Sequence, residues 1–170
     1  MQAFLTLEDV LAIENRCSKT SKGPWKAWIE GRDHWGGDTF IRTGEDPDSV
    51  HASIELSGAT DADHDFIAHA REDVPRLIAD LRAPTSPPSN DALSADQLLE
   101  IETRCSKATG GPWRSFIEGR DHTSGSSFIQ TSDPDIEASG MTDADQDFVA
   151  HARQDIPALI AEIRRLRQAE

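Results

Sequence analysis

The chain contains one short segment twice. Residues 25–34 read WKAWIEGRDH, and residues 113–122 read WRSFIEGRDH. Each copy follows a Gly-Pro pair, and residues 5–19 align with residues 93–107 without a gap. A repeat of this extent predicts two copies of one structural unit. In a chain of 170 residues, each copy has about 80 residues, a size at which a core becomes marginal. We therefore expect each copy to cover apolar surface that the other leaves exposed.

The repeat divides the chain into two units and a linker. The first unit is expected over residues 1–83 and the second over residues 92–170, and residues 84–91 form a Pro/Ser-rich linker of semi-extended character. Residues 44–53 are longer than their counterpart in the second copy, so we expect a surface loop there.

Each unit opens with apolar residues at helical spacing. Thr6 and Ser94 precede the two patterns, and Asp9 and Gln97 follow three residues later, as in a capping box. The helices should end before the Gly-Pro pairs, which start an extended segment.

The repeated segment alternates between two kinds of side chain, as a strand with one buried face does. The predicted core-facing residues are Trp25, Ala27 and Ile29 in the first copy and Trp113, Ser115 and Ile117 in the second. The predicted outward-facing residues are Lys26, Trp28, Glu30 and Arg32, and Arg114, Phe116, Glu118 and Arg120. Two further strands are expected in each copy, at residues 39–43 and 54–56 and at residues 127–131 and 136–138.

A longer helical pattern closes each unit. It begins near Thr60 in the first copy and near Thr142 in the second. Pro75 and Pro157 fall inside these patterns and predict a break or kink, because proline removes a backbone hydrogen bond and clashes with the preceding turn. Asp73 and Asp155 could then cap a new helix. The expected fold is α+β: two tandem α-β-β-β-α repeats related by a pseudo-twofold axis, with antiparallel sheets packed against helices.

The charge of the chain limits its partners. The formal net charge is −14, charged residues make up 28% of the chain and apolar residues 36%. This acidity argues against duplex nucleic acid, which binds proteins through Lys and Arg, and against anionic membranes. We find no apolar segment long enough to span a bilayer and no signal-peptide pattern, so we expect a cytoplasmic protein.

The two cysteines, Cys17 and Cys105, occupy equivalent positions in the two copies. Their place on the apolar side of a helix favours two small buried residues. A Cys17–Cys105 disulfide is the alternative, but a reducing compartment disfavours it. Without a CxxC or CxxH pattern, they do not indicate a zinc site.

The repeats also carry a family resemblance. Its anchors are Gly-Pro-Trp (residues 23–25 and 111–113) and the segments Asp63–Ile78 and Asp145–Ile160, which lie within the pattern DAD(x)DF(I/V)AHARxD(V/I)PxLIA. This combination resembles short bacteriophage and bacterial proteins, some of them called Ead-like phage early proteins, in which one copy is usual. The resemblance implies a phage accessory role, in which small proteins often bind and neutralise a host component. It implies no catalytic residues.

The first candidate site is the outward face of the first strand in each copy. An aromatic ring beside an arginine suits a nucleobase and a phosphate, because the ring stacks and the guanidinium binds oxygens. The candidate ligand-binding residues are Lys26, Trp28, Glu30, Arg32 and His34, and Arg114, Phe116, Glu118, Arg120 and His122. The two copies could line one pocket or form two. Alternatively, Trp28 and Phe116 pack between the repeats, covered by Glu–Arg pairs.

Two other groupings carry titratable side chains. Asp33-His34 and Asp121-His122 could supply a general base, but a structural turn in which the aspartate binds its own backbone is the simpler interpretation. The second grouping lies at a spacing of four along the last helix of each copy. Asp and His at that spacing can hold a divalent metal, although a solvated helix flank explains them equally well. Its members are Asp61, Asp65, His69 and Asp73, and Asp143, Asp147, His151 and Asp155.

These observations favour a binding protein without enzymatic activity, metal or cofactor. The predicted function is sequestration of a small nucleotide-like or anionic ligand, as an anti-defence sponge would do. The alternative is an acidic protein–protein interaction module that inhibits a host protein, similar to immunity or antirepressor proteins. The expected partners are a small anionic ligand or a host protein. The chain is expected to act as a pseudo-dimeric monomer or as a homo-oligomer.

Overall fold

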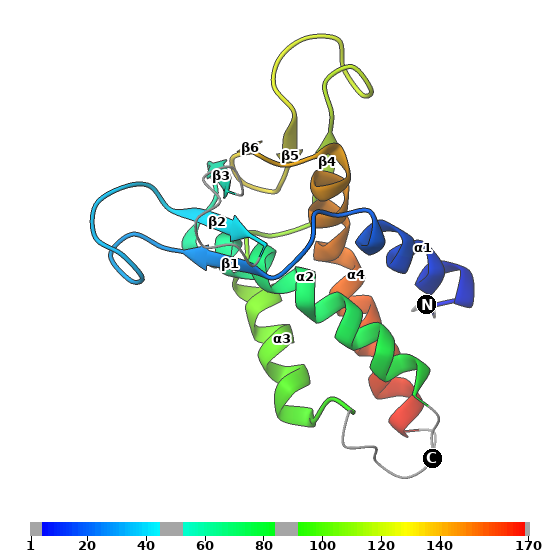
Figure 1. Ribbon diagram of the computed structural model, residues 1–170. Helices are drawn as coiled ribbons and strands as arrows, with labels where there is room; N and C mark the ends of the chain where they lie inside the picture. The colour runs from blue at the N-terminus through cyan, green and yellow to red at the C-terminus, as the bar shows by residue number, and fades with distance from the viewer. Residues whose placement is uncertain (1–4, 45–52, 84–91, 169–170) are drawn as a thin grey trace.

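The computed structural model describes residues 5–44, 53–83 and 92–168. They form an α+β structure with four helices and six strands (Figure 1). In chain order the elements are α1 (Leu7–Ser18), β1 (Trp25–Trp28), β2 (Phe40–Thr43), β3 (Ser53–Ser57), α2 (Asp61–Arg82), α3 (Ala95–Lys107), β4 (Arg114–Phe116), β5 (Phe128–Gln130), β6 (Ile136–Ser139) and α4 (Asp143–Gln168). The predicted α+β class is confirmed. The predicted linker and most of the predicted loop at residues 44–53 lie outside the described residues.

All six strands belong to one antiparallel sheet with the order β1-β2-β3-β6-β5-β4. The expectation of separate sheets was wrong, because β3 pairs with β6 through Glu55–Ser139, Leu56–Ala138 and Ser57–Glu137. This pairing joins the two halves of the chain at the centre of the sheet. It also places β1 and β4, the two copies of the repeated segment, at opposite edges.

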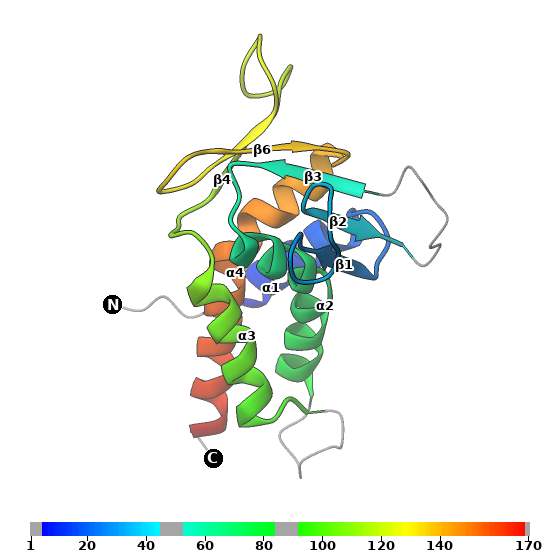
Figure 2. The same ribbon diagram turned by 90° about the vertical axis from the view of Figure 1, so that its left-hand side faces the viewer.

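The helices lie on one side of the sheet (Figures 1 and 2). The long helices α2 and α4 pack against each other, and α1 and α3 each contact both of them. A single buried apolar cluster contains side chains from both halves of the chain. Trp25 and Trp113 are buried in it, as predicted, with exposed fractions of 7% and 1%.

Both long helices continue through their prolines, so the predicted breaks at Pro75 and Pro157 were wrong. A proline inside a helix costs about 3 kcal/mol. Both prolines are exposed, and the Arg153 carbonyl, which loses its helical donor to Pro157, has a long contact from the Cys105 thiol at 4.0 Å. Burial of Val74, Leu77 and Ile78 and of their α4 counterparts opposes this cost. Because the helices continue, Asp73 and Asp155 do not cap new ones.

The helix starts follow the sequence closely. Thr6 and Ser94 cap α1 and α3, and in each case the residue three positions later returns a hydrogen bond to the cap backbone. Thr60 and Thr142 do the same for α2 and α4 with Asp63 and Asp145. Local side-chain chemistry therefore fixes these boundaries.

Contacts between the halves occur in matched pairs. Asp145 accepts hydrogen bonds from the backbone nitrogen and hydroxyl group of Ser21, at 2.6 and 2.7 Å. Asp63 accepts the equivalent bonds from Thr109, also at 2.6 and 2.7 Å. The remaining matched pairs are the ion pairs Arg16–Asp155 and Arg104–Asp73 and the edge-on ring contacts Trp25–Phe148 and Phe66–Trp113. Each half thus completes the core of the other.

Candidate functional site

One face of the sheet has no helix packed on it within the described part of the chain (Figure 2). Side chains alternate between the two faces: Ile41, Ile54, Ile129 and Ile136 are buried on the helix side, and their strand neighbours are half-buried or exposed. We call the other side the open face. Its described side chains are Lys26, Trp28, Phe40, Arg42, Ser53, Glu55 and Ser57 in the first half, and Arg114, Phe116, Phe128, Gln130, Glu137 and Ser139 in the second.

Two aromatic clusters lie on the open face, one toward each edge. In the first half, Trp28 lies parallel to Phe40, with ring centroids 6.5 Å apart, and the His34 ring is 5.7 Å from Phe40. The second cluster repeats this arrangement: Phe116 lies 5.1 Å from Phe128, and the His122 ring is 5.7 Å from Phe128. Since β1 and β4 are at opposite edges, Trp28 and Phe116 do not line one pocket, and they do not pack between the repeats.

The first cluster is also cationic. The Lys26 amine lies 4.7 Å from the centre of the Trp28 ring, and the Arg42 guanidinium lies 5.4 Å from it. The corresponding positions of the second half hold Arg114 and Gln130. The two clusters therefore share a shape but differ in charge.

The centre of the open face is acidic. Glu55 on β3 lies beside Phe40, and Glu137 on β6 lies beside Phe128. Both glutamates are exposed. Neither carboxylate has a hydrogen bond or ion pair with another described residue. Within the described part of the chain, two carboxylates without a direct partner thus lie between the aromatic clusters.

Arg32 and Arg120 are not on the open face with Trp28 and Phe116, contrary to the strand alternation that we expected. The strand ends at Trp28, and a turn follows in which the backbone nitrogens of Arg32 and Asp33 donate to the Ile29 carbonyl. Gly31 has a φ of 80°, a left-handed conformation that glycine adopts without strain. The turn redirects the chain toward the helices. Glu30 and Glu118 are exposed at the equivalent position of each turn.

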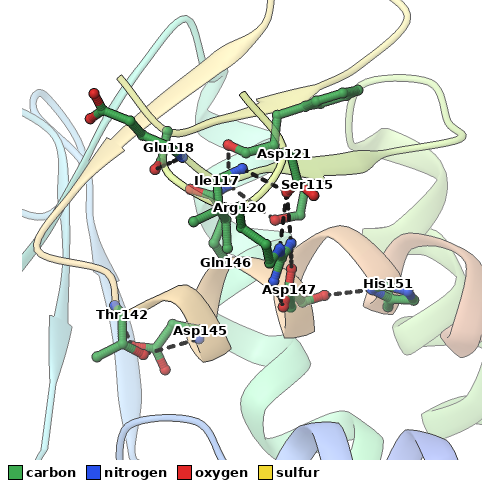
Figure 3. A network of polar contacts seen from close by, with 12 residues as sticks. Ser115, Ile117, Glu118, Arg120, Asp121, Thr142, Asp145, Gln146, Asp147 and His151 are labelled. Atoms are coloured by element: carbon green, nitrogen blue, oxygen red, sulfur yellow. Dashed lines mark hydrogen bonds and ion pairs between the residues drawn. The ribbon is translucent and has the colours of Figure 1, made fainter. Parts of the chain in front are cut away.

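Each of these arginines holds a helix carboxylate with two hydrogen bonds. Arg120 donates to Asp147 of α4 at 2.6 and 2.8 Å, as Figure 3 shows, and Arg32 donates to Asp65 of α2 at 2.7 and 2.8 Å. These carboxylates, with the neighbouring Asp33 and Asp121, raise the pKa of both guanidinium groups. The two arginines therefore fasten the turns to the helices.

The Asp-His pairs form structural turns. Asp33 accepts a hydrogen bond from the backbone nitrogen of Ile29 at 3.0 Å, and Asp121 accepts one from Ile117 at 2.9 Å. This backbone bond is the main cause that lowers the pKa of Asp33. In Asp121 the bonds from Arg120 lower the pKa most. Because these carboxylates already bind the turn backbone and the neighbouring arginine, they are poor partners for a histidine that acts as a general base.

The helical Asp/His stripes do not converge on a metal site. No group of three or more His, Cys, Asp or Glu side chains suited to a metal occurs among the residues that the structure describes. Asp65 and Asp147 hold the arginines of the turns, and Asp73 and Asp155 pair with Arg104 and Arg16.

The cysteines are buried and free, as the burial pattern predicted. Burial raises the pKa of the Cys17 and Cys105 thiols, which disfavours the reactive thiolate. Cys17 borders a cavity of 260 Å³ between α1 and α2, on the helix side of the molecule. This cavity is remote from the open face.

Sequence reasoning missed three parts of this surface. Phe40 and Phe128 occupy equal positions in the second strand of each copy, but only the register shows that they lie beside Trp28 and Phe116. Trp35 lies in the loop between β1 and β2 and is 88% exposed, although tryptophan is usually largely buried. Its isolation in a Gly-rich segment was the signal available in the sequence.

No protein-family model matches the chain, and no curated protein or solved structure matches it. Within the described residues, none of the helices has the length and apolar character needed to cross a membrane.

Proposed function

We propose that this chain is a non-enzymatic binding protein that uses the open face to engage another protein. The observation that carries the proposal is an uncovered sheet face with two separate aromatic clusters. Aromatic residues are enriched in protein–protein interfaces and often dominate their binding energy. A single half-buried ring on a surface is ordinary, but two matched clusters on one face favour a broad contact.

The arginine pairs support a protein partner over a small anion. Arg32 and Arg120 were the residues expected to bind phosphate or carboxylate, and each already holds a carboxylate of this chain. An anionic ligand would have to displace Asp65 or Asp147 from a bidentate pair. The aromatic side chains of the open face, in contrast, lie on one continuous sheet surface. Such a surface suits contact with a protein better than binding of a small anion.

Trp35 extends the proposed surface. It stands in the loop that follows the first aromatic cluster, and the base of this loop is held by the Arg32–Asp65 pair. Tryptophan is among the residue types enriched at interface hot spots. The second half carries Thr123 at the equivalent position, so the two ends of the surface would contribute unequally.

The proposal also covers the repeat symmetry and the biological role of the chain. The matched contacts between the halves support a tandem repeat with pseudo-twofold symmetry. The resemblance to phage early proteins favours a cytoplasmic accessory role in which a host protein is bound and inhibited.

A nucleotide-like ligand is the second candidate. The placement of Lys26 and Arg42 over the Trp28 ring favours it, because a ring with adjacent cations can stack a base and bind its phosphate. This site would exist in the first half alone, since the second cluster has one cation and no tryptophan.

Affinity capture from host lysate tests the proposal. The wild-type chain should retain a stoichiometric protein, and Trp28→Ala with Phe116→Ala should reduce its recovery about tenfold or more. Leu11→Ala with Leu99→Ala is the matched control, because these leucines are exposed on the helix side, and it should leave recovery unchanged. Circular dichroism checks that all variants fold. Calorimetric titration with nucleotides forms the second arm, and saturable nucleotide binding without a captured protein would favour the second candidate.

A further inference from the structure

The open face carries an ordered chemical pattern that narrows the partner. Across the strands, one row of paired residues runs Trp28, Phe40, Glu55, Ser139, and the adjacent row runs Phe116, Phe128, Glu137, Ser57. Each row therefore begins with two aromatic rings at one edge of the sheet and reaches an acid near the centre. Together the rows place an aromatic patch at each end, with Lys26 and Arg42 beside the first patch and Arg114 beside the second, and two carboxylates between them.

The spacing of these patches suits an α-helix. Neighbouring strands lie about 4.8 Å apart, so the midpoints of the two aromatic pairs are separated by about four strand spacings, or roughly 19 Å. A helix rises 1.5 Å per residue, so about 13 residues span this distance. Two positions that are 11 or 14 residues apart lie on the same face of a helix. A position midway between them, about seven residues from each, lies on that face as well.

The two carboxylates at the centre of the open face determine which residue type suits the middle of a docked helix. Glu55 and Glu137 are exposed and have no partner within the described residues. Lysine or arginine at the middle of a docked helix would neutralise them, whereas glutamate would add to the repulsion. A second copy of the chain docked with the two sheet centres opposed would bring four glutamates together, which disfavours self-pairing through this face.

We propose that the open face binds a cationic amphipathic α-helix of a partner protein, laid across the strands. Apolar side chains near the ends of the helix contact the two aromatic clusters, and basic side chains at its middle contact Glu55 and Glu137. This inference rests on the proposed function and adds the chemistry of the partner to it.

Designed peptides test the pattern directly. The probe is a labelled helical peptide of about 18 residues, with two leucines about 11 residues apart on one face and two lysines midway between them. A second peptide carries glutamates in place of the lysines. We expect the lysine peptide to bind the wild-type chain about tenfold or more tightly than the glutamate peptide, and to gain helical circular dichroism on binding.

A charge swap on the protein provides the decisive comparison. Glu55→Lys with Glu137→Lys should reverse the preference, so that the glutamate peptide binds more tightly. Glu72→Lys with Glu100→Lys changes the net charge equally at exposed positions on α2 and α3 and should preserve the lysine preference. If the two double variants alter the preference alike, the attraction is a general charge effect and the proposal is overturned.

The remaining outcomes separate this inference from the proposed function. If the charge swap leaves the peptide preference unchanged while Trp28→Ala with Phe116→Ala still abolishes protein capture, the helix proposal fails and the binding face stands. If the aromatic variants affect neither peptide nor protein, both fail. Concentration-dependent dimerisation that is lost in Trp28→Ala with Phe116→Ala would assign the face to a second copy and overturn the proposal.

Discussion

Trp25 and Trp113 occupy matched buried positions but differ in hydrogen bonding. The Trp113 indole nitrogen donates to the Thr109 carbonyl at 3.1 Å, whereas the Trp25 indole nitrogen is buried without a hydrogen-bond partner among the residues that the structure describes. Replacing Trp113 with phenylalanine removes a hydrogen bond, and the same change at Trp25 removes an unpaired donor. We therefore expect Trp113→Phe to cost about 1–2 kcal/mol more in the free energy of unfolding than Trp25→Phe. Urea denaturation measures both, and equal costs would contradict the assignment.

Asp147 and Asp155 should contribute to acid stability with opposite signs. The bonds from Arg120 lower the pKa of Asp147 below its unfolded value of about 3.9, so its contribution is present above that pH and lost as pH falls through the folded pKa. Burial raises the pKa of Asp155, so its pH-dependent contribution is present at low pH and lost as pH rises through the folded pKa.

This difference predicts two distinct stability profiles between about pH 5 and pH 2. Asp147→Asn should flatten the acid loss of stability relative to the wild type, and Asp155→Asn should steepen it. Denaturant unfolding across this range measures both. Profiles that change in the same direction would contradict the assigned pKa directions.

At the scale of elements, the joint between β3 and β6 depends on a close approach of two backbones. Gly140 follows β6 with a φ of 79°, and a Cβ atom there would collide with the Ser53 carbonyl oxygen. Gly119 has a similar φ of 81°, but nothing lies within 4 Å of its Cβ position. Gly140→Ala should therefore cost about 1–3 kcal/mol more than Gly119→Ala. Similar costs in thermal or urea unfolding would show that the close approach does not constrain this joint.

Helix starts and the core-facing residues of the strands were the features predicted most accurately from the sequence. Capping side chains and alternation are local signals, so Thr6, Ser94 and Thr60 marked helix starts correctly and Trp25 and Trp113 were assigned to the core. The continuation of α2 through Pro75 was missed because tertiary burial outweighed a local preference. The β3–β6 pairing was missed because no local pattern specifies which strand edges meet. The open face depends on that pairing, so the sequence alone indicated Trp28 and Phe116 but not their setting.

For the whole molecule, the shared core predicts cooperative unfolding. Phe66 from the first half packs edge-on against Trp113 from the second, with centroids 5.5 Å apart. Phe66→Ala should lower stability by about 3–5 kcal/mol, and it should shift the melting of both halves together. Differential scanning calorimetry should show one transition in the wild type and one in the variant. Two transitions, of which only one moves, would indicate halves that fold separately.

Oxidative footprinting of the captured complex tests the central claim, that the open face is the binding surface, most directly. Hydroxyl radicals modify exposed aromatic and aliphatic side chains, and mass spectrometry locates the modifications. We expect the partner to protect Trp28, Phe40, Phe116 and Phe128, while Leu7, Leu11 and Leu99 on the helix side react as in the free chain. Protection of those leucines with unchanged reactivity of the four aromatic residues would contradict it.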